Sequence, residues 1–207
     1  MKKILKDAFA LFLITLVAGA MLAGVYEITK APIAQAEQEA RAQAYSAVFA
    51  NAVEFSADDS LTAAVKKADD EFKQVGFGGV ALEDALYVKD ASGNITGCVM
   101  TLGGKGYGGT IRLTMGITTD GMITAISILA HSETAGLGSK CTEPAFYGQF
   151  ANKPATTFTV VKGGAGNDSE IDAISSATIT SEGVTQAVNA GVWFAKTYMG
   201  IEGGAVK

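Results

Sequence analysis

The chain has 207 residues, of which 48% are hydrophobic, with a formal net charge of −5 and a single histidine. This length accommodates one domain with a substantial hydrophobic core and some appended segments. The acidic balance and the lack of a basic stripe argue against nucleic acid as a partner, and one histidine excludes a His-rich or Cys₂His₂ metal site. Cys98 and Cys141 show no CxxC spacing, so we expect no metal ligands there, and either a disulfide or two small buried thiols.

The first predicted element is a membrane anchor. Residues 8–26 contain no charged side chain, and this length is close to the roughly 20 residues with which a helix crosses a bilayer. Lys2, Lys3 and Lys6 precede the run. The positive-inside tendency therefore places the N-terminus in the cytoplasm and the rest of the chain outside it.

A cleaved signal peptide is the alternative interpretation of this segment. The sequences AGA at 18–20 and AQA at 34–36 each resemble a cleavage site. The apolar run is longer than the 7 to 15 residues, roughly, of a signal peptide, so an uncleaved anchor is favoured. Both interpretations place the remainder outside the cytoplasm.

The segment behind the anchor predicts a helix and then mixed structure. Pro32 is expected to interrupt the anchor helix, and residues 33–50, rich in Ala, Glu and Gln, predict a further helix. Residues 51–80 show no single period and end in the turn-like VGFGGV. We therefore assign residues 1–28 to a cytoplasmic tip and transmembrane anchor, and residues 29–80 to a juxtamembrane helical and connecting region.

Two β-hairpins follow. The apolar and β-branched runs at 85–90 and 95–104 flank the turn ASGN, and those at 109–117 and 122–131 flank the turn TTDG. Val, Ile and Thr dominate these runs, as is typical of half-buried strands joined by tight turns.

The last third of the chain mixes short elements and ends in a helix. A loop at 132–140 precedes a short helix around 143–150, and strands are expected at 156–163 and 170–174. The closing segment, residues 181–199, carries its apolar side chains on one helical face. This order predicts an α+β fold: a mainly antiparallel sheet with flanking helices, plus one N-terminal transmembrane helix.

The segment GGKGYGG at 103–109 has five glycines in seven positions. It yields GxGxxG only in a shifted frame, and a strand follows instead of a helix, so a dinucleotide-binding fingerprint is rejected. Two interpretations stay open. The backbone turns sharply or admits a flat group, or the segment is simply a hairpin loop.

Five hydroxyl side chains lie just before the final helix, in DAISSATITSEGV at 172–184. One Ser or Thr would suffice to cap that helix. A helix N-terminus with free N–H groups and the positive end of the dipole also suits a phosphate. A serine hydrolase is disfavoured, because its nucleophile needs an adjacent base and the local sequence offers none.

Residues 172–178, DAISSAT, resemble the D-x-x-[ST]-[SG]-A-T pattern of proteins that carry covalently attached FMN. In that family a flavin transferase uses FAD to attach FMN, through its phosphate, to the final Thr hydroxyl. The resemblance implies that Thr178 is the acceptor. It also explains the missing base, because the transferase supplies the chemistry.

Two further motifs resemble the same FMN-binding domain in the expected order. HSETAGLG at 131–138 is similar to its H-x-E-T-x-G-L-G segment, and GYGG lies upstream at 106–109. The resemblance implies that Glu133 and Thr134 contact the isoalloxazine ring or the ribityl chain, and that Leu137 packs and also touches the ring. Tyr107 either packs beside the flavin or covers the sheet. The cofactor-binding residues implied in this way are Tyr107, Gly108, His131, Glu133, Thr134, Gly136, Leu137, Gly138, Asp172, Ser175, Ser176, Ala177 and Thr178.

Within this family the chain most resembles the G subunits of the Rnf electron-transport complex. That complex is a ferredoxin:NAD⁺ oxidoreductase coupled to sodium or proton movement. The C subunit of the sodium-pumping NADH:quinone reductase shares the anchor and the FMN motif but is usually longer, so it is the second choice.

The resemblance implies an electron carrier without catalytic residues of its own. Residues 81–207 would form its FMN-binding domain, outside the cytoplasm, on a single-pass protein of the inner membrane. The implied partners are other membrane and peripheral Rnf subunits, the membrane lipid and, during maturation, the flavin transferase. An anchored extracytoplasmic binding module without a redox role and an independent flavin reductase are the alternatives from other classes.

Overall fold

The computed structural model describes residues 2–50 and 52–201, and the chain divides into two compact units, Met1–Arg41 and Ala42–Lys207. The last six residues of the expected segment 81–207 lie outside the described residues. The division into anchor, connecting region and FMN-binding segment stays a prediction.

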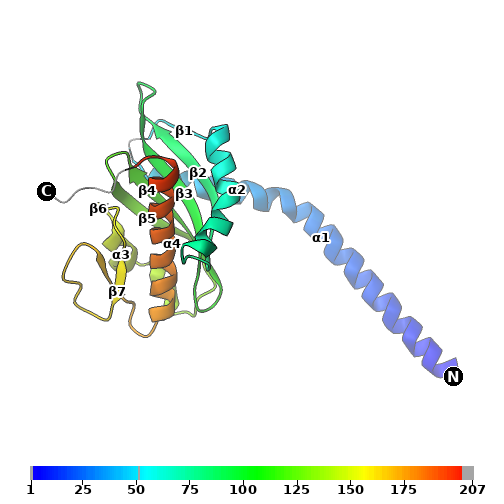
Figure 1. Cartoon of the computed structure of the whole chain (residues 1–207). Coiled ribbons are helices and arrows are strands. Elements are labelled where there is room, and N and C mark those ends of the chain that lie inside the picture. Colours follow the sequence, from blue (N-terminus) through cyan, green and yellow to red (C-terminus); the bar gives the residue numbers. More distant parts are fainter. Residues whose placement is uncertain (1, 51, 202–207) are drawn as a thin grey trace. The chain divides into compact units, whose positions relative to one another are not determined.

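Helix α1 (Lys2–Val48) contains the expected anchor (Figure 1). Its most apolar window has a mean hydropathy of 2.4, and none of that window is buried within the protein. Such side chains need another apolar surrounding, and a bilayer provides one. The expected interruption at Pro32 is wrong, because the proline lies inside the helix. A proline removes one N–H donor, but the Ala, Glu and Gln residues that follow are strong helix formers and continue the helix.

The second unit is built on a six-stranded antiparallel sheet with the strands in sequence order. Both expected hairpins are confirmed, as is the α+β class, although the first strand of the first hairpin begins at Val80, five residues earlier than the sequence suggested. A second, two-stranded sheet pairs β7 with β8 in parallel. The strands are β1 (Glu54–Ser56), β2 (Val80–Lys89), β3 (Ile95–Lys105), β4 (Thr110–Thr118), β5 (Met122–Ala130), β6 (Lys153–Pro154), β7 (Thr159–Val161) and β8 (Glu170–Asp172).

The helices of this unit flank the sheet (Figure 1). Helix α4 starts three residues earlier than expected, so that Thr178 is its first residue. The helices are α2 (Asp59–Gln74), α3 (Pro144–Tyr147) and α4 (Thr178–Tyr198), with 3₁₀ turns η1 (Gly138–Thr142) and η2 (Gly148–Phe150).

Helix α2 is an element that the sequence did not resolve within 51–80. The Asp58 carboxylate caps it by accepting a hydrogen bond of 2.7 Å from the Leu61 N–H. Its buried face consists of Leu61, Ala64, Ala68 and Phe72, which recur at helical spacing.

Helix α4 packs on β3 and β4, and it lies at backbone contact distance from β3. A Cβ on Gly183 would lie 2.4 Å from the Lys105 carbonyl oxygen, and one on Gly104 would lie 2.3 Å from the Gly183 carbonyl oxygen. Only glycines permit this approach. The core beneath the helix includes Cys98 and Cys141, both free thiols in the described structure, so the buried-thiol alternative is confirmed.

Residues at the end of α1 cover the other face of the sheet. Tyr45, Val48 and Phe49 form a small apolar cluster with Val88 and Val99. This cluster and the core beneath α4 bury β3 on both faces, which explains its long run of buried residues.

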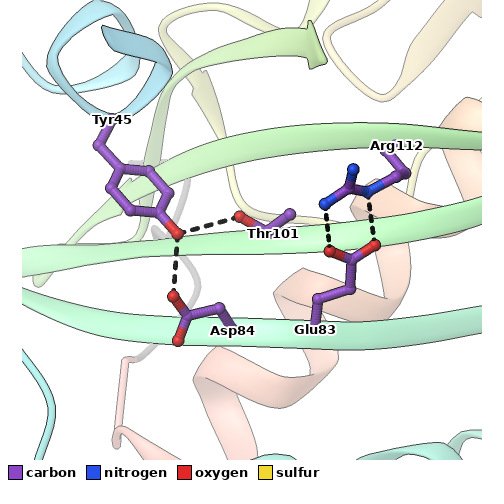
Figure 2. Close-up of polar contacts among 5 residues, drawn as sticks. All are labelled: Tyr45, Glu83, Asp84, Thr101 and Arg112. Carbon is purple, nitrogen blue, oxygen red and sulfur yellow. Dashed lines mark hydrogen bonds and ion pairs between the residues drawn. The ribbon is translucent and has the colours of Figure 1, made fainter. Parts of the chain in front are cut away.

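Figure 2 shows two sets of polar contacts on one face of the sheet, and Tyr45 of the small cluster takes part in one of them. The Tyr45 hydroxyl donates to Asp84 Oδ2 at 3.0 Å and lies 3.1 Å from Thr101 Oγ1. Arg112 makes two hydrogen bonds of 2.7 Å to the Glu83 carboxylate. A β-bulge between Leu82 and Asp84 brings the adjacent residues Glu83 and Asp84 to the same face of the sheet.

Candidate functional site

The glycine-rich segment forms the tight connection between β3 and β4. The Gly106 N–H donates to the Gly109 carbonyl at 2.8 Å and closes the turn. A Cβ on Gly106 would lie 2.3 Å from Glu133 Oε1, and one on Gly108 would lie 2.2 Å from the Ser132 carbonyl oxygen. The segment is therefore a hairpin loop, and the group that its glycines admit closely is the protein's own 131–138 loop.

Glu133 joins three separate segments of the chain. Its Oε1 accepts the Gly108 N–H at 2.9 Å, and its Oε2 accepts the Thr180 hydroxyl at 2.6 Å. A Cβ on Gly138 would lie 2.3 Å from Oε2, so this glycine leaves the space that the carboxylate occupies. The carboxylate thus holds the β3–β4 loop, its own loop and the first turn of α4 together.

Thr178 opens α4 on the wall of the same site. The N-cap position is Ala177, and none of the described side chains makes a capping hydrogen bond there. The first intrahelical bond runs from the Ser181 N–H to the Ala177 carbonyl. The hydroxyl-rich segment is therefore not explained by N-capping, and the N–H groups of the first turn remain available to an anion.

Ser176 sets the direction in which the chain enters α4. Its φ of +62° lies in the left-handed region, which suits glycine and costs a serine energy. The [SG] choice at this position of the motif therefore has a backbone explanation.

A pocket of about 580 Å³ lies between these elements. This volume falls within the usual range for small-molecule sites. Eight of the thirteen expected residues line it, together with Ile179 and Thr180, which are not among the thirteen. The eight are Tyr107, Glu133, Thr134, Leu137, Gly138, Ser176, Ala177 and Thr178.

Two of the five remaining residues lie beside a different hollow. Asp172 and Ser175 line a smaller cavity with Gln149. The Asp172 carboxylate accepts the Ala165 N–H at 3.0 Å, and its backbone N–H donates to Gln149 Oε1 at 2.7 Å. Asp172 thus orders the glycine-rich loop 163–167, away from the pocket that contains Thr178.

The other three shape the loops around the pocket. His131 Nδ1 accepts the Glu133 N–H at 3.1 Å. Gly136 has a φ of +75°, and its N–H donates to Ser139 Oγ at 2.9 Å. Gly108 contributes the backbone N–H that holds Glu133.

The pocket combines an apolar rim with one carboxylate. Tyr107, Leu137 and Ile179 line it and are 74%, 44% and 53% exposed. Glu133 is its only carboxylate, and among the described residues neither Lys nor Arg lines it. Burial and the charge of Glu133 raise the pKa of the neighbouring Cys141 thiol to about 11.

Comparison with known proteins agrees with this geometry. Residues 106–192 match the family model of the FMN-binding domain, and residues 1–48 match that of the RnfG N-terminal region. These matches define a protein whose sequence contains an FMN-binding domain after a candidate membrane-spanning helix.

Full-length relatives give the particular family. The G subunit of the ion-translocating oxidoreductase complex of Methanosarcina acetivorans is 34% identical over 92% of this chain and 94% of its own length. The G subunit of the proton-translocating ferredoxin:NAD⁺ oxidoreductase complex of Clostridium ljungdahlii is 32% identical over 94% and 97%. The chain belongs to the family of G subunits of ion-translocating oxidoreductase complexes, the Rnf family. The resemblance seen in the sequence is thus confirmed.

A solved structure is also similar. NqrC of Shewanella oneidensis is 28% identical, and the match covers 56% of this chain and 58% of that chain with a TM-score of 0.49.

Proposed function

We propose that this chain is a membrane-anchored electron carrier that holds FMN through a phosphoester to Thr178 within a Rnf-type ion-translocating ferredoxin:NAD⁺ oxidoreductase complex. The observation that supports this most is the place of Thr178. This half-buried residue stands at the first position of α4, on the wall of the pocket. Membership in the G-subunit family supports the assignment to such a complex.

The residues around Thr178 fit FMN. The uncapped first turn of α4 offers N–H groups and the positive end of a helix dipole to a phosphoester anion. The exposed side chains of Tyr107, Leu137 and Ile179 offer an apolar rim to a flat aromatic ring. Ser176 and Thr134 provide polar groups on the same wall.

Bound FMN supplies one- and two-electron transfer, and the chain positions it. Attachment would join the Thr178 oxygen to the FMN phosphate, with FAD as donor and AMP as leaving group, on a flavin transferase. Thr178 then fixes the phosphate end, Leu137 and Ile179 keep water from the ring, and Glu133 holds the surrounding loops in place. A tether at Thr178 prevents loss of the cofactor.

The same proposal assigns a location and partners. Helix α1 would span the inner membrane once, with its lysine-flanked start in the cytoplasm and the FMN-binding segment outside. Electrons would arrive from and leave to other membrane and peripheral subunits of the complex. The flavin transferase would act on Thr178 during maturation.

Flavin fluorescence in a denaturing gel tests this proposal. The full-length protein from its native host should fluoresce after denaturation, and Thr178→Ala should be dark. Ser175→Ala is the matched control, because it removes an exposed hydroxyl of the same motif that faces a different cavity, and it should stay fluorescent. A dark wild-type band, from a host that flavinylates other proteins, would contradict the proposal and favour an anchored binding module.

A further inference from the structure

The carboxylate of Glu133 is buried beside the pocket that contains Thr178. The residue is only 9% exposed, yet it lines this pocket. Both carboxylate oxygens accept hydrogen bonds, one from a backbone N–H and one from a hydroxyl, as an ionised carboxylate does. Its position is fixed by the close glycines at 106 and 138.

Among the described residues, no cationic side chain forms an ion pair with this carboxylate, and the partial positive charge of the first turn of α4 lies beside it. Both of its hydrogen-bond donors are neutral groups. The residues that line the pocket include no Lys or Arg among those described. The site therefore combines a fixed negative charge with an apolar, poorly screening rim, where charges interact strongly.

We propose that Glu133 is a positioning residue that fixes a negative charge beside the flavin and thereby makes this FMN a low-potential carrier. Two-electron reduction with uptake of one proton gives the neutral isoalloxazine one negative charge. A neighbouring carboxylate disfavours that product, so the oxidised form gains stability. A lower potential favours electron transfer from the flavin to its acceptor and requires a correspondingly stronger donor, such as a reduced iron–sulfur protein. This inference rests on the proposed function.

The test compares midpoint potentials of flavin-loaded, full-length chains in detergent. Dithionite, which is oxidised to sulfite, reduces the flavin in the presence of mediators while its absorbance is recorded. Glu133→Gln should shift the ratio of reduced to oxidised flavin at a fixed potential by about tenfold toward the reduced form, a rise of about 30 mV for a two-electron couple. Glutamine keeps the shape, and its amide can still pair with both donors because the Thr180 hydroxyl can turn to accept.

Two variants separate charge from structure. Glu133→Asp keeps the carboxylate and should keep a potential close to that of the wild type. Glu182→Gln removes an exposed carboxylate of α4 outside this pocket and should leave the potential unchanged. Melting temperatures of all four chains show whether a shift accompanies a loss of folding.

Several outcomes would overturn the proposal. A flavin-loaded Glu133→Gln chain with the wild-type potential would show that Glu133 only holds the loops. An equal shift in Glu182→Gln would assign the effect to overall charge. A Glu133→Gln chain without flavin would show that the residue serves attachment instead. A dark wild-type chain, in contrast, would refute the proposed function itself.

Discussion

The contact between α4 and β3 predicts a sharp difference between two Gly→Ala substitutions in the same helix. In Gly183→Ala the new methyl group would meet the Lys105 carbonyl oxygen at 2.4 Å, and backbone cannot move aside. In Gly191→Ala it would meet Met115 Sδ at 2.4 Å, near the end of a flexible side chain. Both substitutions gain about 1 kcal/mol of helix propensity.

The net change in the free energy of unfolding therefore differs between the two variants. Overpacking against backbone costs about 3 kcal/mol, at the upper end of the usual range, which leaves Gly183→Ala destabilised by about 2 kcal/mol. That corresponds to a fall in melting temperature of about 4–8 °C for a chain of this size. Gly191→Ala should stay within about 0.5 kcal/mol of the wild type, because Met115 can change rotamer at a cost similar to the propensity gain.

Thermal unfolding followed by far-UV circular dichroism measures both variants in detergent. Flavin fluorescence should also fall in Gly183→Ala, because displacement of α4 moves Thr178 away from the 131–138 loop. Equal melting temperatures for the two variants would refute the claim that α4 lies at backbone contact distance from β3.

Three smaller predictions concern the rest of the domain. Tyr45→Phe leaves the buried Thr101 and the part-buried Asp84 without their hydroxyl partner and should cost about 1–2 kcal/mol in denaturant unfolding; an unchanged midpoint would contradict the network. Ser176→Gly should be at least as stable as the wild type, whereas Ser176→Val should cost about 1–2 kcal/mol, since φ is positive there; equal melting temperatures would contradict this. Cys98 and Cys141 should resist a thiol reagent at about pH 8 until the chain unfolds, because burial raises the pKa of both thiols; labelling of the folded chain would count against this.

Much of the fold follows from local pattern. The hairpins of β2–β5 alternate β-branched and apolar residues around Gly-containing turns, and α4 carries a continuous apolar face. Helix α2 escaped prediction because two of its four buried residues are alanines, which give a weak apolar signal. The residue that marks its start, Asp58, can be recognised as a cap only once the helix itself is expected.

The sequence predicts most residues that line the pocket, but not the hydrogen bonds that join them. The three motifs located eight lining residues of the pocket, and the tertiary fold brings them together. Thr180 was noted only as one of several hydroxyls, since its partner Glu133 lies 47 residues away in the sequence. Asp172 belongs to the same motif as Thr178, yet it orders a loop beside another cavity.

The residues of the flavin motifs have different structural roles, so a match to the motifs does not by itself show that FMN is bound. Gly106, Gly108 and Gly138 belong to the flavin motifs, but each leaves room for the protein's own groups. The residue types that suit position 176 are set by its positive φ. A chain could therefore retain most of these motifs for reasons of folding alone, even if it had lost the cofactor. Thr178 differs from these positions, because its side chain is placed on the pocket wall and does not cap the helix that it begins. If FMN is attached at Thr178 as proposed, substitution of Thr178 separates flavin attachment from fold maintenance, which substitution of the glycines cannot do.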